Sequence, residues 1–98
     1  MAKELKMDKI TSAAKTLRVL GHPVRIKIIE FLSDSEKNVG SIQKHIKFPQ
    51  AVTSQHLKLL LVNGLVNKRR EKNFIYYRQN DTMLSGITKL IQDTKPGS

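Results

Sequence analysis

The sequence predicts a small, mainly helical domain with one β-hairpin, the arrangement of a winged helix-turn-helix with about five helices and one two-stranded hairpin. Apolar residues recur at helical spacing over residues 10–61 and again over residues 83–91. Between these segments, residues 65–79 follow the two-residue period of strands. The chain has 98 residues, a length that suits one domain. We assign residues 1–94 to that domain and expect residues 95–98 to form a frayed tail.

The first two helices are marked by apolar spacing and by a stop signal between them. The first should begin at about Lys3 or Asp8 and end at Leu20, because Gly21 and Pro23 follow. Its apolar positions are Ile10, Ala13, Ala14, Leu17 and Leu20. Pro23 suits the first turn of the second helix, whose apolar positions are Val24, Ile28, Ile29 and Leu32. The polar run of residues 33–38 ends that pattern.

The third and fourth helices are short and joined by a tight turn. Asn38 or Ser41 can cap the third helix, which carries Ile42 and Ile46. Phe-Pro at 48–49 separates it from the fourth helix, which begins near Gln50 and stops at the Asn-Gly pair 63–64. The residues of the fourth helix expected to face inward are Thr53, Leu57, Leu60 and Leu61. Two helices connected in this way predict a helix-turn-helix.

A hairpin and a last helix complete the chain. Residues 65–70 and 74–79 are rich in β-branched or aromatic residues and predict two strands, with Glu71, Lys72 and Asn73 as the turn. Asp81 or Thr82 is expected to cap the last helix. Its apolar residues are Met83, Leu84, Ile87, Leu90 and Ile91.

The positive charge of the chain is concentrated in its middle. The formal net charge is +10, and residues 37–80 hold nine Lys or Arg but only one acid, Glu71. Such a block favours a polyanionic partner, nucleic acid first and an anionic membrane surface second. No apolar run approaches the roughly 18 residues that a membrane span needs. We therefore expect an intracellular protein whose partner is nucleic acid.

The outer face of the fourth helix carries short polar side chains that suit the edges of DNA bases. If the apolar residues face the core, helical geometry leaves Gln50, Ala51, Ser54 and Gln55 outside. Gln can pair with adenine through two hydrogen bonds, Ser can donate or accept, and an Ala methyl can contact a thymine methyl. We predict that these four residues contact bases. The alternative is an ordinary solvated helix face.

Phosphate contacts are expected from the hairpin and from the two preceding helices. The predicted hairpin contacts are Lys68, Arg69, Arg70, Lys72, Asn73, Tyr76 and Arg78. The predicted helical contacts are Ser41, Lys44, Lys47, His56 and Lys58. Such contacts supply affinity and salt dependence but carry no sequence information. The alternatives are protection of an edge strand by Lys and Arg and, for Lys44 and Lys47, simple solvation.

At four places the sequence resembles the ArsR-type dimeric winged-helix repressors of bacteria and archaea. The segment LGHPVRIKII at 20–29 resembles the family's entry into its second helix, and QAVTSQHLKLL at 50–60 resembles its recognition helix. NGLV at 63–66 and IYYR at 75–78 are similar to the family's connector and second wing strand. The resemblance implies a homodimer joined through its first and last helices, with two recognition helices in successive major grooves of double-stranded DNA and the wings along the flanking backbone. It also implies a cytoplasmic, nucleoid-associated protein of a prokaryote.

Two short segments depart from the family pattern, and both lie in the predicted DNA interface. Ala51 and Val52 are less polar than the family's residues there, which leaves the preferred bases open. The wing tip has Lys72 and Asn73 where the family often has glycine. Asn tolerates the left-handed conformation, so a turn of different shape is expected.

The first and last helices carry more apolar surface than a monomer of this size readily covers. We therefore predict that the apolar residues of both helices form the dimer interface. The residues assigned to it are Ile10, Leu17, Met83, Leu84, Ile87 and Ile91.

No metal site, other cofactor or catalytic centre is expected. The chain has no cysteine, and no two of its three histidines, His22, His45 and His56, have the spacing that places imidazoles on one helical face. The family's metal sensors use cysteines on the third helix or Asp and His on the last, and neither set is present. No phosphate loop or base-activated nucleophile is recognisable.

Two functions outside enzymology remain open from the residues. One is a sequence-specific transcriptional regulator, a repressor that binds a palindromic operator as a homodimer. The other is a winged-helix adaptor for a protein or RNA. The polar outer face of the fourth helix favours the regulator, because a protein-binding helix should expose large apolar anchors. The sequence leaves open whether the effector is a small organic molecule, a partner protein or absent. If there is one, we expect it to bind where the first and last helices meet.

Overall fold

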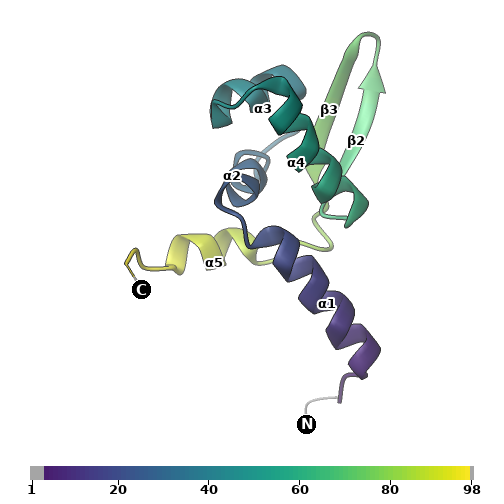
Figure 1. The fold of residues 1–98 in the computed structure, drawn as a ribbon, viewed down its shortest axis with the longest axis vertical. Coiled ribbons are helices and arrows are strands. Elements are labelled where there is room, and N and C mark those ends of the chain that lie inside the picture. Colours follow the sequence, from purple (N-terminus) through teal and green to yellow (C-terminus); the bar gives the residue numbers. More distant parts are fainter. Residues whose placement is uncertain (1–3, 98) are drawn as a thin grey trace.

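Helices α2, α3 and α4 and a three-stranded sheet form the body of the protein, from which α1 and α5 extend in different directions (Figure 1). The structure is a computed structural model that describes residues 4–97. In chain order the elements are α1 (Met7–Leu20), α2 (Pro23–Phe31), β1 (Lys37–Asn38), α3 (Val39–Ile46), α4 (Gln50–Val62), β2 (Val66–Glu71), β3 (Phe74–Gln79) and α5 (Ile87–Asp93). The predicted winged helix-turn-helix is confirmed. A start of the first helix at Lys3 lies outside the described residues.

Side-chain caps and one left-handed residue set the boundaries of the helix-turn-helix. The His22 Nδ1 atom accepts a hydrogen bond from the Val24 N–H at 3.2 Å and so caps α2, which begins at Pro23 as predicted. Of the two candidate caps for α3, Asn38 takes the role, because its Oδ1 atom accepts from the Ser41 N–H at 2.8 Å. Lys47, at a φ of 61°, ends α3 and turns the chain toward α4.

The core lies where α2, α3 and α4 meet the base of the sheet. Its buried apolar residues are Leu20, Ile28, Ile29, Leu32, Ile42, Ile46, Leu57, Leu60, Leu65, Val66, Tyr77 and Leu84. Two polar side chains, Thr53 and Gln79, are buried with them. The Gln79 Nε2 atom donates a hydrogen bond to the Ile29 carbonyl at 2.6 Å. The end of β3 is thereby tied to α2, which fixes the base of the hairpin on the helical body.

The sheet contains one strand that the sequence did not predict. Its order is β1-β3-β2, with both pairs antiparallel. Strand β1 has only two residues, Lys37 and Asn38, too few for a pattern of alternation to appear. The long hairpin of β2 and β3 projects away from the helices as the wing (Figure 1).

Two predicted details of the C-terminal half are wrong. The hairpin turn contains Lys72 and Asn73 while Glu71 belongs to β2, and the left-handed residue is Lys72, at a φ of 55°, rather than Asn73. Helix α5 begins at Ile87 rather than after a cap at Asp81 or Thr82. The Asn80 carbonyl accepts from the N–H groups of Met83 and Leu84 in a tight turn, and Gly86, at a φ of 87°, then breaks the path before the helix starts.

Candidate nucleic-acid interface

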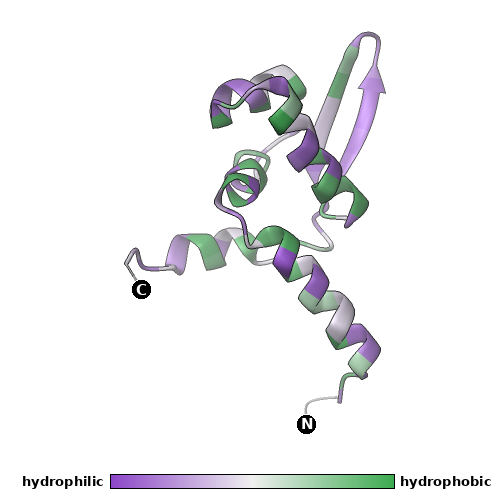
Figure 2. Cartoon of the chain, viewed as in Figure 1, coloured by the Kyte–Doolittle hydropathy of each residue, from purple (hydrophilic) through white to green (hydrophobic). Residues whose placement is uncertain are grey.

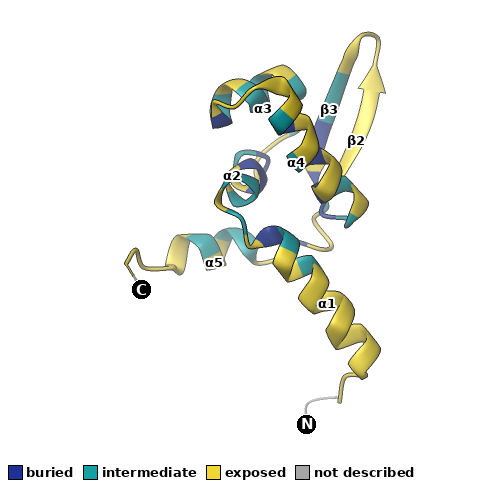
Figure 3. Ribbon diagram, in the orientation of Figure 1, coloured by how far each residue is buried: buried dark blue, intermediate teal, exposed yellow. Residues whose placement is uncertain are grey.

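Helix α4 divides into a buried face and an exposed polar face, as its sequence predicts. Thr53, Leu57 and Leu60 are almost completely buried, and the Thr53 hydroxyl donates to the Pro49 carbonyl at 3.0 Å, which secures the first turn. The opposite face is exposed (Figure 3). It carries Gln50, Ala51, Ser54, Gln55 and Lys58, all exposed to solvent. The residues predicted to contact bases therefore share one accessible surface.

A groove joins this face of α4 to the tip of the wing. Its volume is about 390 Å³. Gln50 and Ser54 line it on the side of α4, Gln43 on the side of α3, and Asn73 and Phe74 at the wing. The recognition surface is thus continuous from helix to wing tip.

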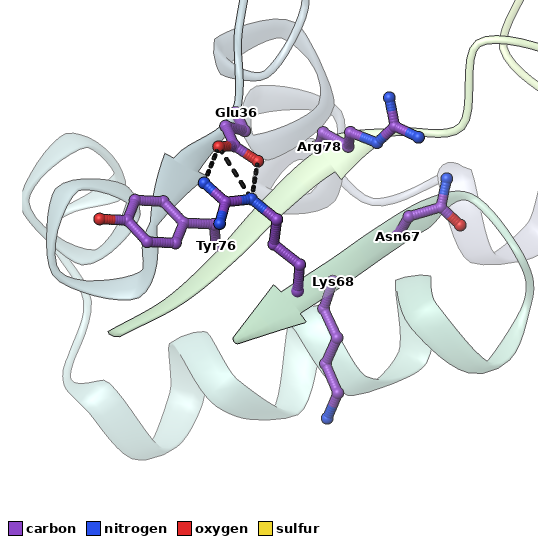
Figure 4. Close-up of a pocket in the computed structure, with 6 residues that line it drawn as sticks. Glu36, Asn67, Lys68, Tyr76 and Arg78 are labelled. Atoms are coloured by element: carbon purple, nitrogen blue, oxygen red, sulfur yellow. Dashed lines mark hydrogen bonds and ion pairs between the residues drawn. The ribbon is translucent and has the colours of Figure 1, made fainter. Parts of the chain in front are cut away.

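The two faces of the wing differ in what they offer to a polyanion. Strand β2 is hydrophilic along almost its whole length (Figure 2). Lys68 pairs with the buried Tyr77 and Arg70 pairs with Ile75, so both basic side chains lie on the side of the sheet that packs toward α4. Figure 4 shows Lys68 on the side of α4 and Glu36 on the opposite side of the hairpin.

Arg69, which was predicted to contact phosphate, lies on that opposite face and pairs with two carboxylates of the protein. Its Nε atom donates to both Glu36 carboxylate oxygens at 3.1 and 3.0 Å, its Nη2 atom also contacts Glu36, and its Nη1 atom donates to Glu71 at 3.2 Å. Its guanidinium carbon lies 4.7 Å from the centre of the Tyr76 ring. Hydrogen bonding to Arg69 lowers the pKa of Glu36, and the two carboxylates raise the pKa of Arg69.

Tyr76, which was also predicted to contact phosphate, packs its ring against the Arg69 guanidinium. The half-buried ring lies beneath Arg69 and lines a pocket of about 340 Å³ with Glu36 and Arg78. Arg78 remains exposed beside it. Sequence reasoning missed Glu36, because a glutamate in a polar loop gives no sign that it will meet an arginine 33 positions later.

Six further residues predicted to contact phosphate differ in their exposure to solvent. Lys44, Lys47, Lys58, Lys72 and Asn73 are exposed. Ser41 is half-buried at the start of α3, where its backbone N–H is held by the Asn38 cap.

His56, which was predicted to contact phosphate, has a ring nitrogen that is hydrogen bonded within the protein. The half-buried ring accepts a hydrogen bond at Nδ1 from the Arg25 Nε atom at 3.2 Å and lies 4.7 Å, centre to centre, from the His22 ring. Burial, followed by the charges of His22 and Arg25, lowers the pKa of His56. Arg25, which no sequence pattern singled out as a partner, holds this contact.

The histidines do not assemble a metal centre within the described part of the chain. The fold brings His22 and His56 together although they are 34 positions apart, while the His45 ring stacks on Phe31 at 4.0 Å. Among residues 4–97, no three His, Cys, Asp or Glu residues are grouped so that they could hold a metal ion.

Apolar residues are exposed along α1 and α5, as predicted for an interface between subunits. Leu17 is 63% exposed and Met83 49% exposed, and a groove of about 560 Å³ runs between the two segments. Ile10 is exposed, and Ile87 and Ile91 are half-buried. Leu84 is the exception, because it is only 5% exposed and belongs to the core of the protomer. Leu5, Met7 and Leu90 are further exposed apolar residues that the prediction omitted.

None of the helices within residues 4–97 combines the length and the apolar character needed to cross a bilayer.

Comparison with known proteins identifies relatives of the whole fold. The model of the family described as "Bacterial regulatory protein, arsR family" matches residues 22–68. The transcriptional repressor PagR of Bacillus anthracis is 38% identical over 80 residues, which are 80% of this chain and 79% of PagR. The transcriptional activator HlyU of Vibrio cholerae is 30% identical over 87 residues, covering 88% of this chain and 81% of HlyU.

Solved structures agree with the sequence matches. HlyU from Vibrio cholerae superposes with a TM-score of 0.82 at 28% identity, covering 89% of this chain and 95% of that one. The homodimeric winged helix-turn-helix DNA-binding domain of a possible ArsR-family regulator from Mycobacterium bovis superposes with a TM-score of 0.78 at 26% identity, covering 94% and 87% of the two chains.

Proposed function

Because the chain belongs to the ArsR family of bacterial regulatory proteins, it is a DNA-binding transcriptional regulator and not an enzyme, and we propose that it represses transcription as a homodimer on a palindromic operator. PagR is named a repressor and HlyU an activator. A repressor needs only to occupy its operator, a task for which the described surface is sufficient. We place this activity in the cytoplasm, on the nucleoid.

In this proposal α4 enters the major groove with Gln50, Ala51, Ser54 and Gln55 toward the base edges. The observation that carries it is the groove that joins Gln50 and Ser54 of α4 to Asn73 at the tip of the basic wing. A helix in the major groove then brings the wing alongside the flanking backbone. Lys72 and Asn73 at the tip reach the same backbone.

Phosphate contacts come from the exposed residues of this surface. We assign them to Lys44, Lys47, Lys58, Lys68, Arg70, Lys72 and Asn73. The half-buried Ser41 at the start of α3 and the exposed Arg78 on the other face of the wing are further candidates. Arg69, Tyr76 and His56 are left out because their polar atoms or rings are occupied within the protein.

The two protomers meet through α1 and α5, whose exposed apolar residues are Ile10, Leu17 and Met83 with the half-buried Ile87 and Ile91. Burying these side chains in a two-fold interface removes apolar area from water. It also sets the separation of the two α4 helices, which must match half-sites about one helical turn of DNA apart.

A regulator of binding, if the cell supplies one, acts in this proposal at the groove between α1 and α5. The groove is lined mainly by apolar side chains such as Leu17, Leu20 and Leu90, which suits an apolar or weakly polar molecule. Zinc, nickel, cobalt and peroxide are expected to leave the affinity for the operator unchanged, because the chain has no cysteine. A tenfold loss with micromolar metal that a chelator reverses would contradict this expectation.

The test of the proposed function is selection of bound duplexes from a random pool, followed by binding to the selected operator. Gln50→Ala or Gln55→Ala should relax the preferred base at one position in each half-site, at about 1 to 3 kcal/mol per lost contact. Lys58→Ala, on the same helix, serves as the control and should weaken all duplexes alike. A pool that yields no inverted repeat, or a Gln variant that keeps the base preference of the wild type, would contradict the proposal.

A further inference from the structure

Three side chains meet at the point where α1, α2 and α4 come together. Arg25, in the first turn of α2, donates from Nη1 to the Val19 carbonyl in the last turn of α1 at 3.1 Å. The same guanidinium donates from Nε to His56 Nδ1 on α4 at 3.2 Å. The His22 ring, from the turn between α1 and α2, lies 4.7 Å from the His56 ring. We call Arg25, His22 and His56 the three-helix junction.

The junction links the part of the chain assigned to the dimer with the part assigned to DNA. Helix α1 carries Ile10 and Leu17 of the proposed subunit interface, whereas α4 carries the proposed base contacts. A single guanidinium spans the two, since Arg25 holds the end of α1 with one nitrogen and the middle of α4 with another. Its rigid fork suits this double role in a way that a lysine ammonium cannot reproduce.

The hydrogen bonds of the junction determine the state of both imidazoles. His22 Nδ1 accepts from the Val24 N–H and His56 Nδ1 accepts from Arg25, so neither Nδ1 atom carries a proton. Each neutral ring therefore holds its proton on Nε2. This arrangement also opposes metal binding, because the nitrogens left to face a metal are the protonated ones.

A protonated imidazole has two donors and no acceptor. Protonation of His56 removes the acceptor for Arg25 and places a cation against the guanidinium. The charged groups that act on the pKa of His56 are His22 from the turn before α2 and Arg25 from α2 itself, both of which, together with burial, favour the neutral ring.

We propose that the three-helix junction positions α4 for DNA and comes apart when the His56 imidazole is protonated, so that the affinity for the operator falls in acid. The inference rests on the proposed role of α4. It makes Arg25 a positioning residue for binding and His56 the group that senses the proton.

The direction of the effect separates this inference from ordinary electrostatics. Protonating histidines adds positive charge, which by itself strengthens binding to phosphate. Release of the junction predicts the opposite, a weakening on the order of tenfold between pH 8 and pH 5.5 from lost hydrogen bonds in two protomers.

The experiment measures fluorescence anisotropy of a labelled selected operator at constant ionic strength from pH 8 to pH 5.5, with circular dichroism confirming that each protein is folded at each pH. The readout is the ratio of the dissociation constants at the two pH values. Asn places an amide oxygen close to the position of the imidazole Nδ1 atom and does not titrate, so the His22→Asn/His56→Asn double variant should give a ratio near one. His45→Gln is the matched control, because His45 stacks on Phe31 outside the junction and should leave the acid loss intact.

Arg25→Lys adds a second variant with the charge of the wild type. It should weaken binding at pH 8 and flatten the pH profile, because one ammonium cannot hold both acceptors in the same geometry. Wild-type affinity that is constant or rises in acid would overturn the inference, as would a double variant that keeps the full acid loss. Absence of sequence-specific binding at pH 8 would instead overturn the proposed function itself.

Discussion

Arg69 and Arg70 are adjacent on the wing, have the same charge and differ in what surrounds them, which makes them a matched pair for testing how the wing binds DNA. Arg70 lies on the face of the hairpin turned toward α4, whereas Arg69 is held by Glu36 and Glu71 on the opposite face. Each Arg→Ala substitution removes one positive charge per protomer. We expect only the change at Arg70 to remove a phosphate contact.

The size of the difference follows from counterion release. Each phosphate neutralised by the protein contributes about 0.9 to the slope of log affinity against log salt concentration. Loss of Arg70 from both protomers should therefore lower the magnitude of the slope by about 1.8. Between about 50 and about 200 mM salt, the wild type then loses roughly tenfold more affinity than the Arg70→Ala variant.

Arg69→Ala should leave the slope within about 0.3 of the wild type, because no counterion is released where Glu36 already holds the guanidinium. Its affinity can still fall through the uncompensated charges of Glu36 and Glu71, but by a similar factor at each salt concentration within that range. Anisotropy titrations of one labelled operator at five salt concentrations measure both quantities. Equal slopes for the two variants, or a larger change for Arg69→Ala, would refute the assignment of the two faces of the wing.

Three further predictions concern stability and assembly. Leu57→Ala should lower the free energy of unfolding by about 2 to 5 kcal/mol, because Leu57 is 1% exposed in the core. Chemical denaturation at fixed protein concentration measures this loss. A loss under about 1 kcal/mol would contradict the packing of α4. Because the pKa of His56 is lowered in the folded protein, the unfolded chain binds more protons in acid than the folded chain does. The contribution of His56 to the free energy of unfolding is therefore complete above about pH 6.5 and is lost as the pH falls below that value. The free energy of unfolding, measured from pH 8 to pH 5, should show this fall, and His56→Asn should reduce it. In sedimentation, Ile87→Asp should shift the protein from about twice the 11.2 kDa chain mass toward the mass of the monomer. Lys89→Ala, at an exposed position of the same helix, should leave the dimer intact. A wild type that stays monomeric at micromolar concentration would contradict the proposed interface.

The local elements could be predicted because their signals lie within a few residues of one another. Pro23 and the Asn-Gly pair at 63–64 mark helix ends directly, and the burial of Thr53, Leu57 and Leu60 follows from helical periodicity. The start of α5 could not be predicted in the same way. Asp81 and Thr82 have the composition of a cap, but the turn closed by the Asn80 carbonyl competes for the same backbone N–H groups.

The sequence by itself determined the winged helix-turn-helix, the position of the basic wing and the polar outer face of α4, because periodicity, turn residues and charge are local properties of the chain. Only the tertiary structure decided which charged side chains and rings are already hydrogen bonded within the protein. Glu36 reaches Arg69 across 33 positions, and Arg25 reaches His56 across 31. No local pattern records such pairings, since they depend on how the helices and the hairpin pack, and a side chain already hydrogen bonded within the fold has less to offer DNA.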